Sequence, residues 1–163
     1  MRSDHEEIIL RNPALGACAF WHLAAKYAEH SDGEATVLPH FLIGSGMIFH
    51  RTTIEKIRQM WFDSGVLKAV AEEPIILAGL QGRVEQYHLA ALKALQLGVS
   101  SGLLLRDGGY GFPAFRAVGG DLPKALREAQ VDCADIFAGA KRLGAWFAME
   151  PIEVLSRQLN IEF

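Results

Sequence analysis

The sequence predicts a mainly α-helical fold with a small β-hairpin, a winged-helix-like helical domain. Apolar residues recur every three or four positions through most of the chain, which is the period of an amphipathic helix. A glycine-rich turn at Asp107-Gly108-Gly109 separates two short apolar segments, which is typical of a hairpin. The length of 163 residues suits one domain, and we expect a single domain over residues 1–163 because no linker or internal repeat interrupts it.

The first helix is predicted to begin at Pro13 and to run to about His30. Asn12 can cap the free N–H groups of its first turn, and Pro13 has no N–H to lose there. Apolar side chains cover most of this helix, so we expect it to be buried on most sides. Its polar residues share one narrow stripe: His22, Lys26, Glu29 and His30.

A second apolar stretch opens at Leu38-Pro39, and Gly44-Ser45-Gly46 within it predicts a kink or a break. Thr52 and Glu55 then have the spacing of a capping box, in which the Thr52 hydroxyl accepts from the backbone N–H of Glu55. A short helix is therefore expected here. Its predicted buried stripe consists of Ile54, Ile57 and Trp61.

Two more helices are predicted before the hairpin. After Asp63-Ser64-Gly65, a short helix through Val70 should end at Glu73, because the residue before a proline is disfavoured in a helix. Pro74 begins the next helix, and Gly98 is expected to end it with a left-handed cap. The buried stripe of that helix is Leu80, Val84, Tyr87, Ala91 and Leu95.

The C-terminal part combines the hairpin with two helices. Residues 103–106 and 110–115 are the predicted strands. A long helix is expected from Asp121, and Pro151 begins a last short one. Ile136 and Trp146 lie beyond the main buried stripe of the long helix, and we take them as candidates for a partner interface, which buried aromatic side chains often anchor.

No motif in the sequence predicts a catalytic residue, a cofactor site or a metal site. A phosphate-binding loop ending in Gly-Lys-Ser or Gly-Lys-Thr is missing. Cys18 and His22, four apart on one helix, can meet as a nucleophile with its base or as half a metal site, but the apolar surroundings of Cys18 favour core packing. We therefore expect a protein that is not an enzyme, has no cofactor and takes no small-molecule substrate.

The local basic cluster of note is Arg51, Lys56 and Arg58, at the start of the capped short helix. Two interpretations stay open for it. Phosphate or DNA contact is reasonable because the N–H groups of a helix N-terminus add to the basic side chains. A solvated face is the other interpretation, since Glu55 lies among them and the net charge of −3 gives no general attraction to nucleic acid.

Half of the residues are hydrophobic, and we expect part of this apolar excess to lie on the surface as a partner interface. The longest apolar run, Val37 to Phe49, is shorter than the roughly 20 residues that a membrane span requires, so no membrane contact is expected. Cys18 and Cys133 stand far apart and no secretory leader precedes them, which favours a reduced, cytoplasmic location.

Three stretches together resemble the small middle component of three-component ABC ATPase systems. They are Arg11-Asn12-Pro13-Ala14-Leu15-Gly16-Ala17, the apolar run from Leu38-Pro39 to His50-Arg51, and Leu97-Gly98 before the hairpin. The best-known members of that family are accessory subunits of Lamassu-type bacterial defence complexes. In those complexes an SMC-like coiled-coil ATPase works with an effector, which is often a nuclease.

The resemblance implies a non-catalytic accessory subunit in a bacterial anti-phage or anti-plasmid defence complex. Such a subunit binds the SMC-like ABC ATPase and the effector subunit, and helps to hold the effector inactive until foreign or aberrant DNA is sensed. DNA would be reached through the assembled complex. The resemblance carries no catalytic residue to any position of this chain.

The alternative function is a free-standing winged-helix DNA-binding transcriptional regulator, which the order of helices and hairpin also suggests. Such a regulator requires a basic recognition helix. The helix before the hairpin offers Arg83, His88 and Lys93 against Glu85, which is a poor match for a protein that must neutralise several phosphates. A third class, an enzyme with a cysteine nucleophile, depends on Cys18 and His22 alone.

Overall fold

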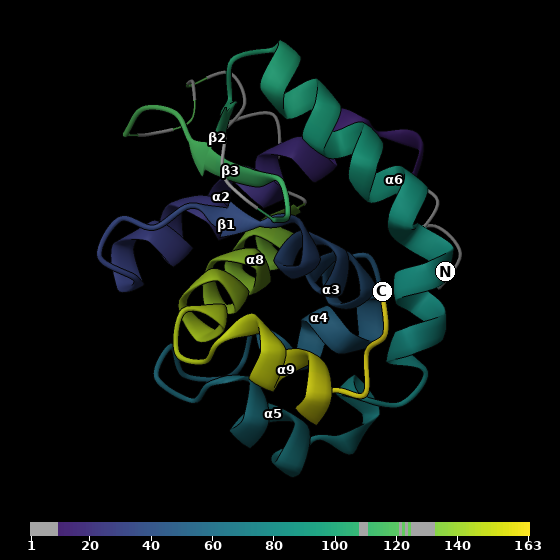
Figure 1. Cartoon of the computed structure of the whole chain (residues 1–163). Helices are drawn as coiled ribbons and strands as arrows, with labels where there is room; N and C mark the ends of the chain where they lie inside the picture. Colours follow the sequence, from purple (N-terminus) through teal and green to yellow (C-terminus); the bar gives the residue numbers. More distant parts are fainter. Residues whose placement is uncertain (1–9, 108–110, 121, 123, 125–132) are drawn as a thin grey trace.

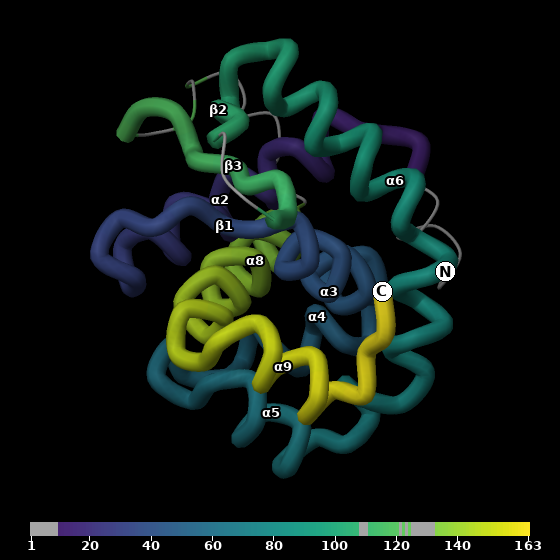
Figure 2. Tube along the Cα trace, viewed as in Figure 1, coloured from purple at the N-terminus to yellow at the C-terminus, as the bar shows by residue number. Residues whose placement is uncertain are grey.

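The computed structural model describes residues 10–107, 111–120, 122, 124 and 133–163. Its helices surround a small antiparallel sheet of three short strands (Figure 1, Figure 2). The predicted class, mainly α with a small hairpin, is confirmed. The winged-helix likeness stays a prediction.

The described elements follow one another along the chain with these bounds. They are α2 (Pro13–His30), β1 (Thr36–Val37), α3 (Leu38–Ile48), α4 (Arg51–Ile57), α5 (Val66–Glu72), the short 3₁₀ helix η1 (Pro74–Ile76), α6 (Leu80–Ser100), β2 (Leu104–Asp107), β3 (Ala114–Ala117), α8 (Ala134–Phe147) and α9 (Ile152–Gln158).

The sheet has the order β1-β3-β2, and both pairs are antiparallel. The expected hairpin is present as β2 and β3, with Leu104 opposite Ala117, but its second strand begins at Ala114, later than the predicted residue 110. Strand β1, which places Thr36 opposite Phe115, has no counterpart among the predicted elements. Two residues are too few to show the alternation by which a strand is recognised.

Helix α2 begins and ends where the sequence predicts. The Asn12 side chain accepts a hydrogen bond from the backbone N–H of Leu15 at 3.2 Å, which caps the first turn. α2 crosses α8 very closely at Gly144, where an added Cβ would lie 2.2 Å from the Leu23 carbonyl oxygen. Only glycine allows this approach of the two backbones.

The second apolar stretch does not break at its glycines, because α3 is helical without interruption from Leu38 to Ile48. A kink within α3 stays a prediction. The glycines of α3 serve close packing instead. A Cβ on Gly44 would lie 3.0 Å from Leu23 Cδ1, and a Cβ on Gly46 would lie 3.0 Å from Leu80 Cδ1. Burial against neighbouring helices offsets the low helix propensity of these two residues.

Two expectations about α4 are also wrong. The helix begins at Arg51, so Thr52 lies inside it, and Glu55 pairs with Arg51 Nε at 2.8 Å instead of closing a capping box. α4 ends at Ile57, one turn earlier than expected. Trp61 therefore lies outside the helix and its side chain is 79% exposed.

The helix that the sequence predicts from Pro74 to Gly98 also begins and ends at other residues. Pro74 begins the short η1, and α6 itself begins at Leu80, after Gly79 with a φ of 72°. Gly98 does not end α6, since the helix runs on to Ser100. Gly98 instead admits the side chain of Leu104, whose Cδ1 would lie 2.7 Å from an added Cβ. The left-handed position falls at Gly102, with a φ of 83°. The five residues of the predicted stripe are all buried.

The C-terminal helices partly test the sequence prediction. The expected start of a long helix at Asp121 lies outside the described residues, and the described helix α8 begins at Ala134. α9 begins at Ile152, directly after Pro151, as expected.

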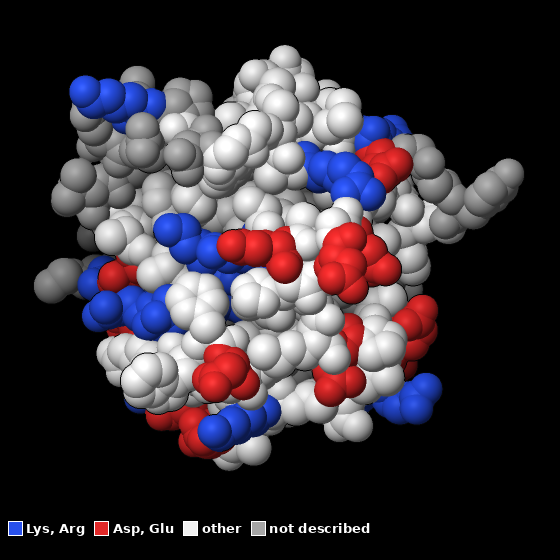
Figure 3. Space-filling model, turned by 90° about the vertical axis from the view of Figure 1, so that its left-hand side faces the viewer, with Lys and Arg blue, Asp and Glu red and all other residues white. Residues whose placement is uncertain are grey.

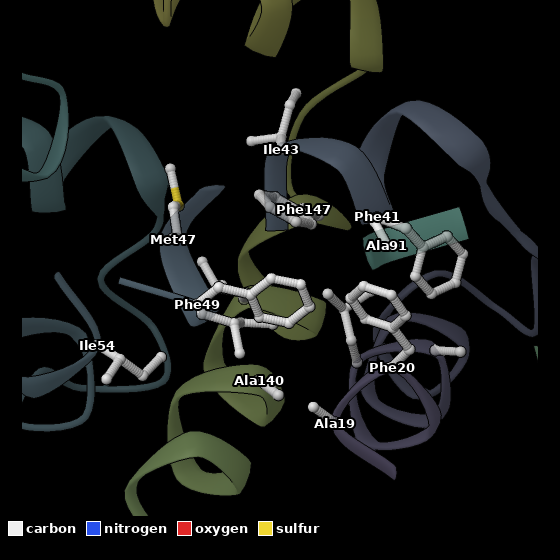
Figure 4. Close-up of a cluster of buried hydrophobic side chains, with 14 of the residues drawn as sticks. Ala19, Phe20, Phe41, Ile43, Met47, Phe49, Ile54, Ala91, Ala140 and Phe147 are labelled. Atoms are coloured by element: carbon white, nitrogen blue, oxygen red, sulfur yellow. The ribbon is translucent and has the colours of Figure 1, made fainter. Parts of the chain in front are cut away.

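Aromatic and branched side chains from α2, α3 and α8 form the centre of the core (Figure 4). The ring centroids of Phe20 and Phe41 are 5.2 Å apart in an edge-to-face arrangement, and Phe41 meets Phe115 of β3 in the same way at 5.6 Å. Phe49 continues the cluster to Tyr87 of α6 at 5.8 Å. One set of rings thus joins the sheet to the helices.

His40 is an unusual member of this core. It is 2% exposed, and its ring lies between Tyr27 and Phe147, with centroids 5.0 and 5.3 Å away. Neither ring nitrogen has a hydrogen-bond partner among the described residues. Burial lowers the pKa of His40 from 6.5 to about 4, so the ring is neutral in the folded chain at neutral pH.

We predict that His40 makes the chain less stable in mild acid. The pKa of His40 is 6.5 in the unfolded chain and about 4 in the folded chain. Between these pH values the unfolded chain binds more protons, so the free energy of unfolding keeps its highest value above pH 6.5 and decreases as the pH falls toward 4. At pH 4 the loss from this one group is about 3 kcal/mol. Urea titrations of wild type and His40→Phe at pH 7 and pH 4 measure it.

The pKa of His22 is also lowered to about 4, so His40→Phe should keep part of the acid loss and not all of it. His88 is exposed, and His88→Gln is the matched control that should behave like wild type. An acid loss of wild-type size in His40→Phe contradicts the prediction.

Candidate partner-binding surfaces

The two residues expected at a partner interface, Ile136 and Trp146, lie inside the chain. Ile136 is 5% exposed and Trp146 is 1% exposed. α4 and the segment after it cover this side of α8, so both side chains are buried within the chain although they lie outside the main stripe of their helix. A role of either residue at a partner interface stays a prediction. Contact of either side chain with a partner would require this part of the core to open.

Trp146 instead supports a surface made by the segment between α4 and α5. Its indole N–H donates to the carbonyl oxygens of Trp61 at 3.2 Å and Phe62 at 3.0 Å. Arg142, one turn earlier on α8, donates from Nε to the Met60 carbonyl at 2.7 Å, and its guanidinium lies 4.7 Å from the centroid of the Phe62 ring. Two side chains of α8 therefore hold this segment in place.

Large apolar side chains on this segment and beside it are exposed to solvent. We call them the Trp61 surface. It consists of Trp61, Phe62 and Met149. Met149 joins the other two because its sulfur lies 3.2 Å from the Cβ position of Gly65, in the same segment. Tryptophan is the residue most enriched among those that dominate binding energy at interfaces. An exposed tryptophan on a well-held segment is thus a candidate contact residue.

A second apolar surface lies between α6 and the hairpin. A groove of about 380 Å³ is lined there mainly by apolar side chains: Leu38, Leu92, Leu95, Val99, Pro113 and Phe115, with Gln96, Ser100 and Arg106 as its polar members. On the open side of α6, Leu89 is 61% exposed and continues the same stripe. We call this groove together with Leu89 the α6–hairpin groove.

The spacing of the α6 side chains along the α6–hairpin groove is typical of helix–helix packing. Leu89, Leu92, Gln96 and Val99 are separated by three, four and three residues, which is the a/d pattern of a helix that packs along another helix. These side chains stand beside the buried stripe that faces the core. α6 thus has a buried apolar stripe and, beside it, a second stripe that is apolar except at Gln96 and is exposed at Leu89 and Leu92.

The two surfaces lie toward opposite ends of the molecule. In Figure 1 the hairpin and the C-terminal end of α6 are at the top, whereas α4 and α5, which flank the Trp61 surface, are in the lower half. A single partner of moderate size that covers one surface leaves the other accessible.

The basic cluster expected to contact phosphate is engaged in ion pairs. Arg51 pairs with Glu55 at 2.8 Å, Lys56 with Glu73 at 3.6 Å and Arg58 with Asp135 at 3.3 Å. All six side chains are at least one-third exposed, so each pair contributes little to stability. The carboxylates nevertheless balance the three positive charges, and a phosphate must compete with them.

The pair Cys18 and His22 does not form an accessible reactive site. Cys18 is buried in the core, and His22 lies against Phe137 with ring centroids 4.8 Å apart. Burial, and then the charges of Lys141 and Lys26, lower the pKa of His22 to about 4. Among the described residues, no three His, Cys, Asp or Glu side chains are placed to hold a metal ion. None of the described helices has the length and hydropathy to cross a membrane.

Sequence reasoning missed both apolar surfaces. The apolar spacing predicts Trp61 in a buried stripe, although Asp63-Ser64-Gly65 follows it closely and the helix ends before it. The spacing of Leu89, Leu92 and Val99 is visible in the sequence, but only the packing of the folded chain shows which of two adjacent stripes of α6 faces the core.

Comparison with known protein families identifies a match over the whole chain. The family model described as "ABC-three component (ABC-3C) system Middle Component 3" matches residues 1–163. No curated protein and no solved structure matches the chain.

We predict unequal effects on stability for Trp61, which is exposed, and Trp146, which supports it from below. Trp146→Phe keeps a buried ring but removes the indole N–H that donates to both carbonyls. The Trp61 carbonyl keeps a bond from the Ser64 backbone N–H, whereas the Phe62 carbonyl loses its indole donor, and the free energy of unfolding should fall by about 1–3 kcal/mol. Trp61→Ala is the control and should change it by less than about 0.5 kcal/mol, because the side chain is mostly exposed. Urea unfolding followed by circular dichroism compares them. Equal effects would show that Trp146 does not hold the segment.

Proposed function

The chain belongs to the Middle Component 3 (MC3) family of ABC-three component systems, and from that premise we propose that it is a non-catalytic adaptor that joins two partner subunits. The observation that carries the proposal is the pair of separated apolar surfaces on a chain whose described part holds no metal-ligand cluster. A middle component requires contact with more than one other subunit. Two surfaces at opposite ends provide such contacts without mutual exclusion.

For the α6–hairpin groove we propose a helix of the system's ABC ATPase as the occupant. The a/d spacing on α6 suits a partner helix, and an SMC-like ATPase with coiled-coil arms carries long helices of this kind. α6 spans 21 residues, or about 31 Å, enough for several turns of contact. Arg106 in the groove favours a partner helix with a carboxylate beside its apolar stripe.

For the Trp61 surface we propose the effector subunit, which is a nuclease in many systems of this kind. The surface combines a tryptophan, a phenylalanine and an arginine that lies over the phenylalanine ring, a composition typical of residues that dominate interface energy. The resemblance of the sequence to Lamassu-type accessory subunits extends this proposal to a role in a bacterial anti-phage or anti-plasmid defence complex, in which the adaptor keeps the effector inactive until DNA is sensed.

The second candidate function, a free-standing transcriptional regulator, is less well supported. It would place α6 in the major groove with Arg83 among its phosphate or base contacts. Arg83 instead donates to the backbone carbonyls of Gly46 at 2.8 Å, Ile76 at 2.9 Å and Ala78 at 2.6 Å, and so fixes the start of α6 against α3. The remaining basic side chains of α6 are too few to neutralise several phosphates.

We predict that each apolar surface can be disabled separately. Leu92→Glu puts a charge into the α6–hairpin groove and should weaken binding to the ABC ATPase roughly thirtyfold or more, the effect of removing a dominant interface residue. Binding to the effector should be unchanged. Affinity measurements with the purified ATPase and effector subunits of the same system provide the test.

Trp61→Ala should give the reverse result, with weaker effector binding and unchanged ATPase binding, and no loss of fold. Phe163→Asp is the matched control, because Phe163 is exposed but belongs to neither surface. The adaptor proposal fails if both variants bind both subunits as tightly as this control does.

Direct DNA contact by Arg51, Lys56 and Arg58 stays a prediction for the assembled complex. Changing all three to glutamine removes their charges without placing new acids beside Glu55. Phosphate contact requires the slope of log affinity against log salt to become shallower by about 0.9 for each phosphate that is no longer neutralised. Lys68→Gln, at an exposed ion pair elsewhere, is the control. An unchanged slope would show that the three side chains do not contact phosphate and only form ion pairs within the chain.

A further inference from the structure

A cleft of about 560 Å³ lies between α2, β3 and α8, apart from both apolar surfaces. Three basic side chains from three different elements line it: Lys26 of α2, Arg116 of β3 and Lys141 of α8. The polar stripe of α2 thus has a clear position, since His22, Lys26 and Glu29 all face this cleft. Glu29 is the acidic residue of the lining.

Local contacts fix two of the three cations. Arg116 pairs through Nε with Asp107 at 2.9 Å and donates from Nη1 to the Gly33 carbonyl, so its guanidinium is held at the edge of the cleft. Lys26 pairs with Glu29 at 2.7 Å. Lys141 makes no ion pair with any residue that the structure describes. The described lining therefore carries an excess of positive charge.

The same positive charges act on the neighbouring His22. After burial, the largest causes that lower the pKa of His22 are the positive charges of Lys141 and Lys26. His22 is thus neutral at physiological pH. It can donate or accept a hydrogen bond there without adding charge.

The rim of the cleft leaves the backbone open to a ligand. Gly119 and Gly120 line it, and a Cβ added to either would have no atom of the described residues within 4 Å. Gly119 has a φ of 78°, which favours glycine at this position. The indole N–H of Trp21 donates to the Val118 carbonyl at 3.0 Å and anchors the chain just before the two glycines.

We propose that this cleft binds a phosphate-bearing ligand of nucleotide size. Its volume lies within the range of small-ligand sites, roughly 300–1,000 Å³. Lys26, Arg116 and Lys141 are suited to phosphate oxygens, whereas Ala25, Ala28 and Ala117 provide an apolar part for the remainder of the ligand.

The charge distribution favours a small ligand over a nucleic-acid duplex. Figure 3 shows Lys and Arg side chains next to Asp and Glu across the face seen from the left of Figure 1. The described residues visible there form no continuous basic surface, which a duplex would need for several phosphate contacts. The cleft shares no residue with either apolar surface, so ligand binding here and the adaptor function can be tested separately.

The test measures binding of four probes to the full chain by calorimetry: ATP without magnesium, inorganic pyrophosphate, adenosine and a 5′-phosphorylated hexathymidylate. We expect ATP and pyrophosphate to bind and adenosine to bind at least tenfold more weakly than ATP. Lys141→Met and Lys26→Met should each weaken ATP binding about tenfold, the effect of removing one charge-assisted hydrogen bond. Lys68→Met, outside the cleft, should bind ATP like wild type.

Amide NMR spectra locate the site even if one lysine variant is unstable. ATP should shift the backbone signals of Gly119 and Gly120 in wild type, and whichever lysine variant folds should need about tenfold more ATP for the same shifts. The proposal is overturned if adenosine binds as tightly as ATP, if neither lysine variant weakens ATP binding, or if the glycine signals do not move. Tighter binding of the hexathymidylate than of ATP would also overturn it, in favour of single-stranded nucleic acid.

Discussion

The close crossing of α2 and α8 is the contact on which the rest of the structure depends. Gly144 allows the two backbones to approach until an added Cβ would lie 2.2 Å from the Leu23 carbonyl oxygen. Around this crossing α8 supplies side chains to the cleft, to the Trp61 surface and to the core. Lys141 lines the cleft, Arg142 and Trp146 hold the Trp61 surface, and Phe147 packs beside His40 in the core. A displacement of α8 would therefore disturb all of them together.

Much of the fold was readable from the sequence because periodic apolar residues and local capping signals are properties of short segments. The bounds of α2 and the buried stripe of α6 followed from Asn12, Pro13 and simple spacing. The glycines were harder. Gly44, Gly46 and Gly98 resemble breaks or caps, although they lie inside helices where neighbouring helices or a strand approach closely. Sequence alone does not distinguish a glycine that ends a helix from one that admits a neighbour.

The candidate sites were less predictable, and the two tryptophans show why. Local patterns predict Trp61 in the core and Trp146 near a partner, whereas Trp61 is exposed and Trp146 is buried beneath it. The difference comes from long-range hydrogen bonds. The Trp146 indole N–H donates to the backbone carbonyls of Trp61 and Phe62, which precede it by 85 and 84 positions in the sequence. The cleft was hidden for the same reason, since Lys26, Arg116 and Lys141 converge only in the folded chain.

The support beneath the Trp61 surface also bears on how well it can bind. A binding surface on a loose segment loses conformational entropy when a partner orders it, at a cost of about 0.5–1.5 kcal/mol for each side chain immobilised. Here the carbonyls of Met60, Trp61 and Phe62 are already held by Arg142 and Trp146. Arg142 also lies over the Phe62 ring and restricts its rotation. The backbone that presents Trp61 is therefore ordered before any partner arrives. More of the energy gained by burying its exposed indole then remains as affinity.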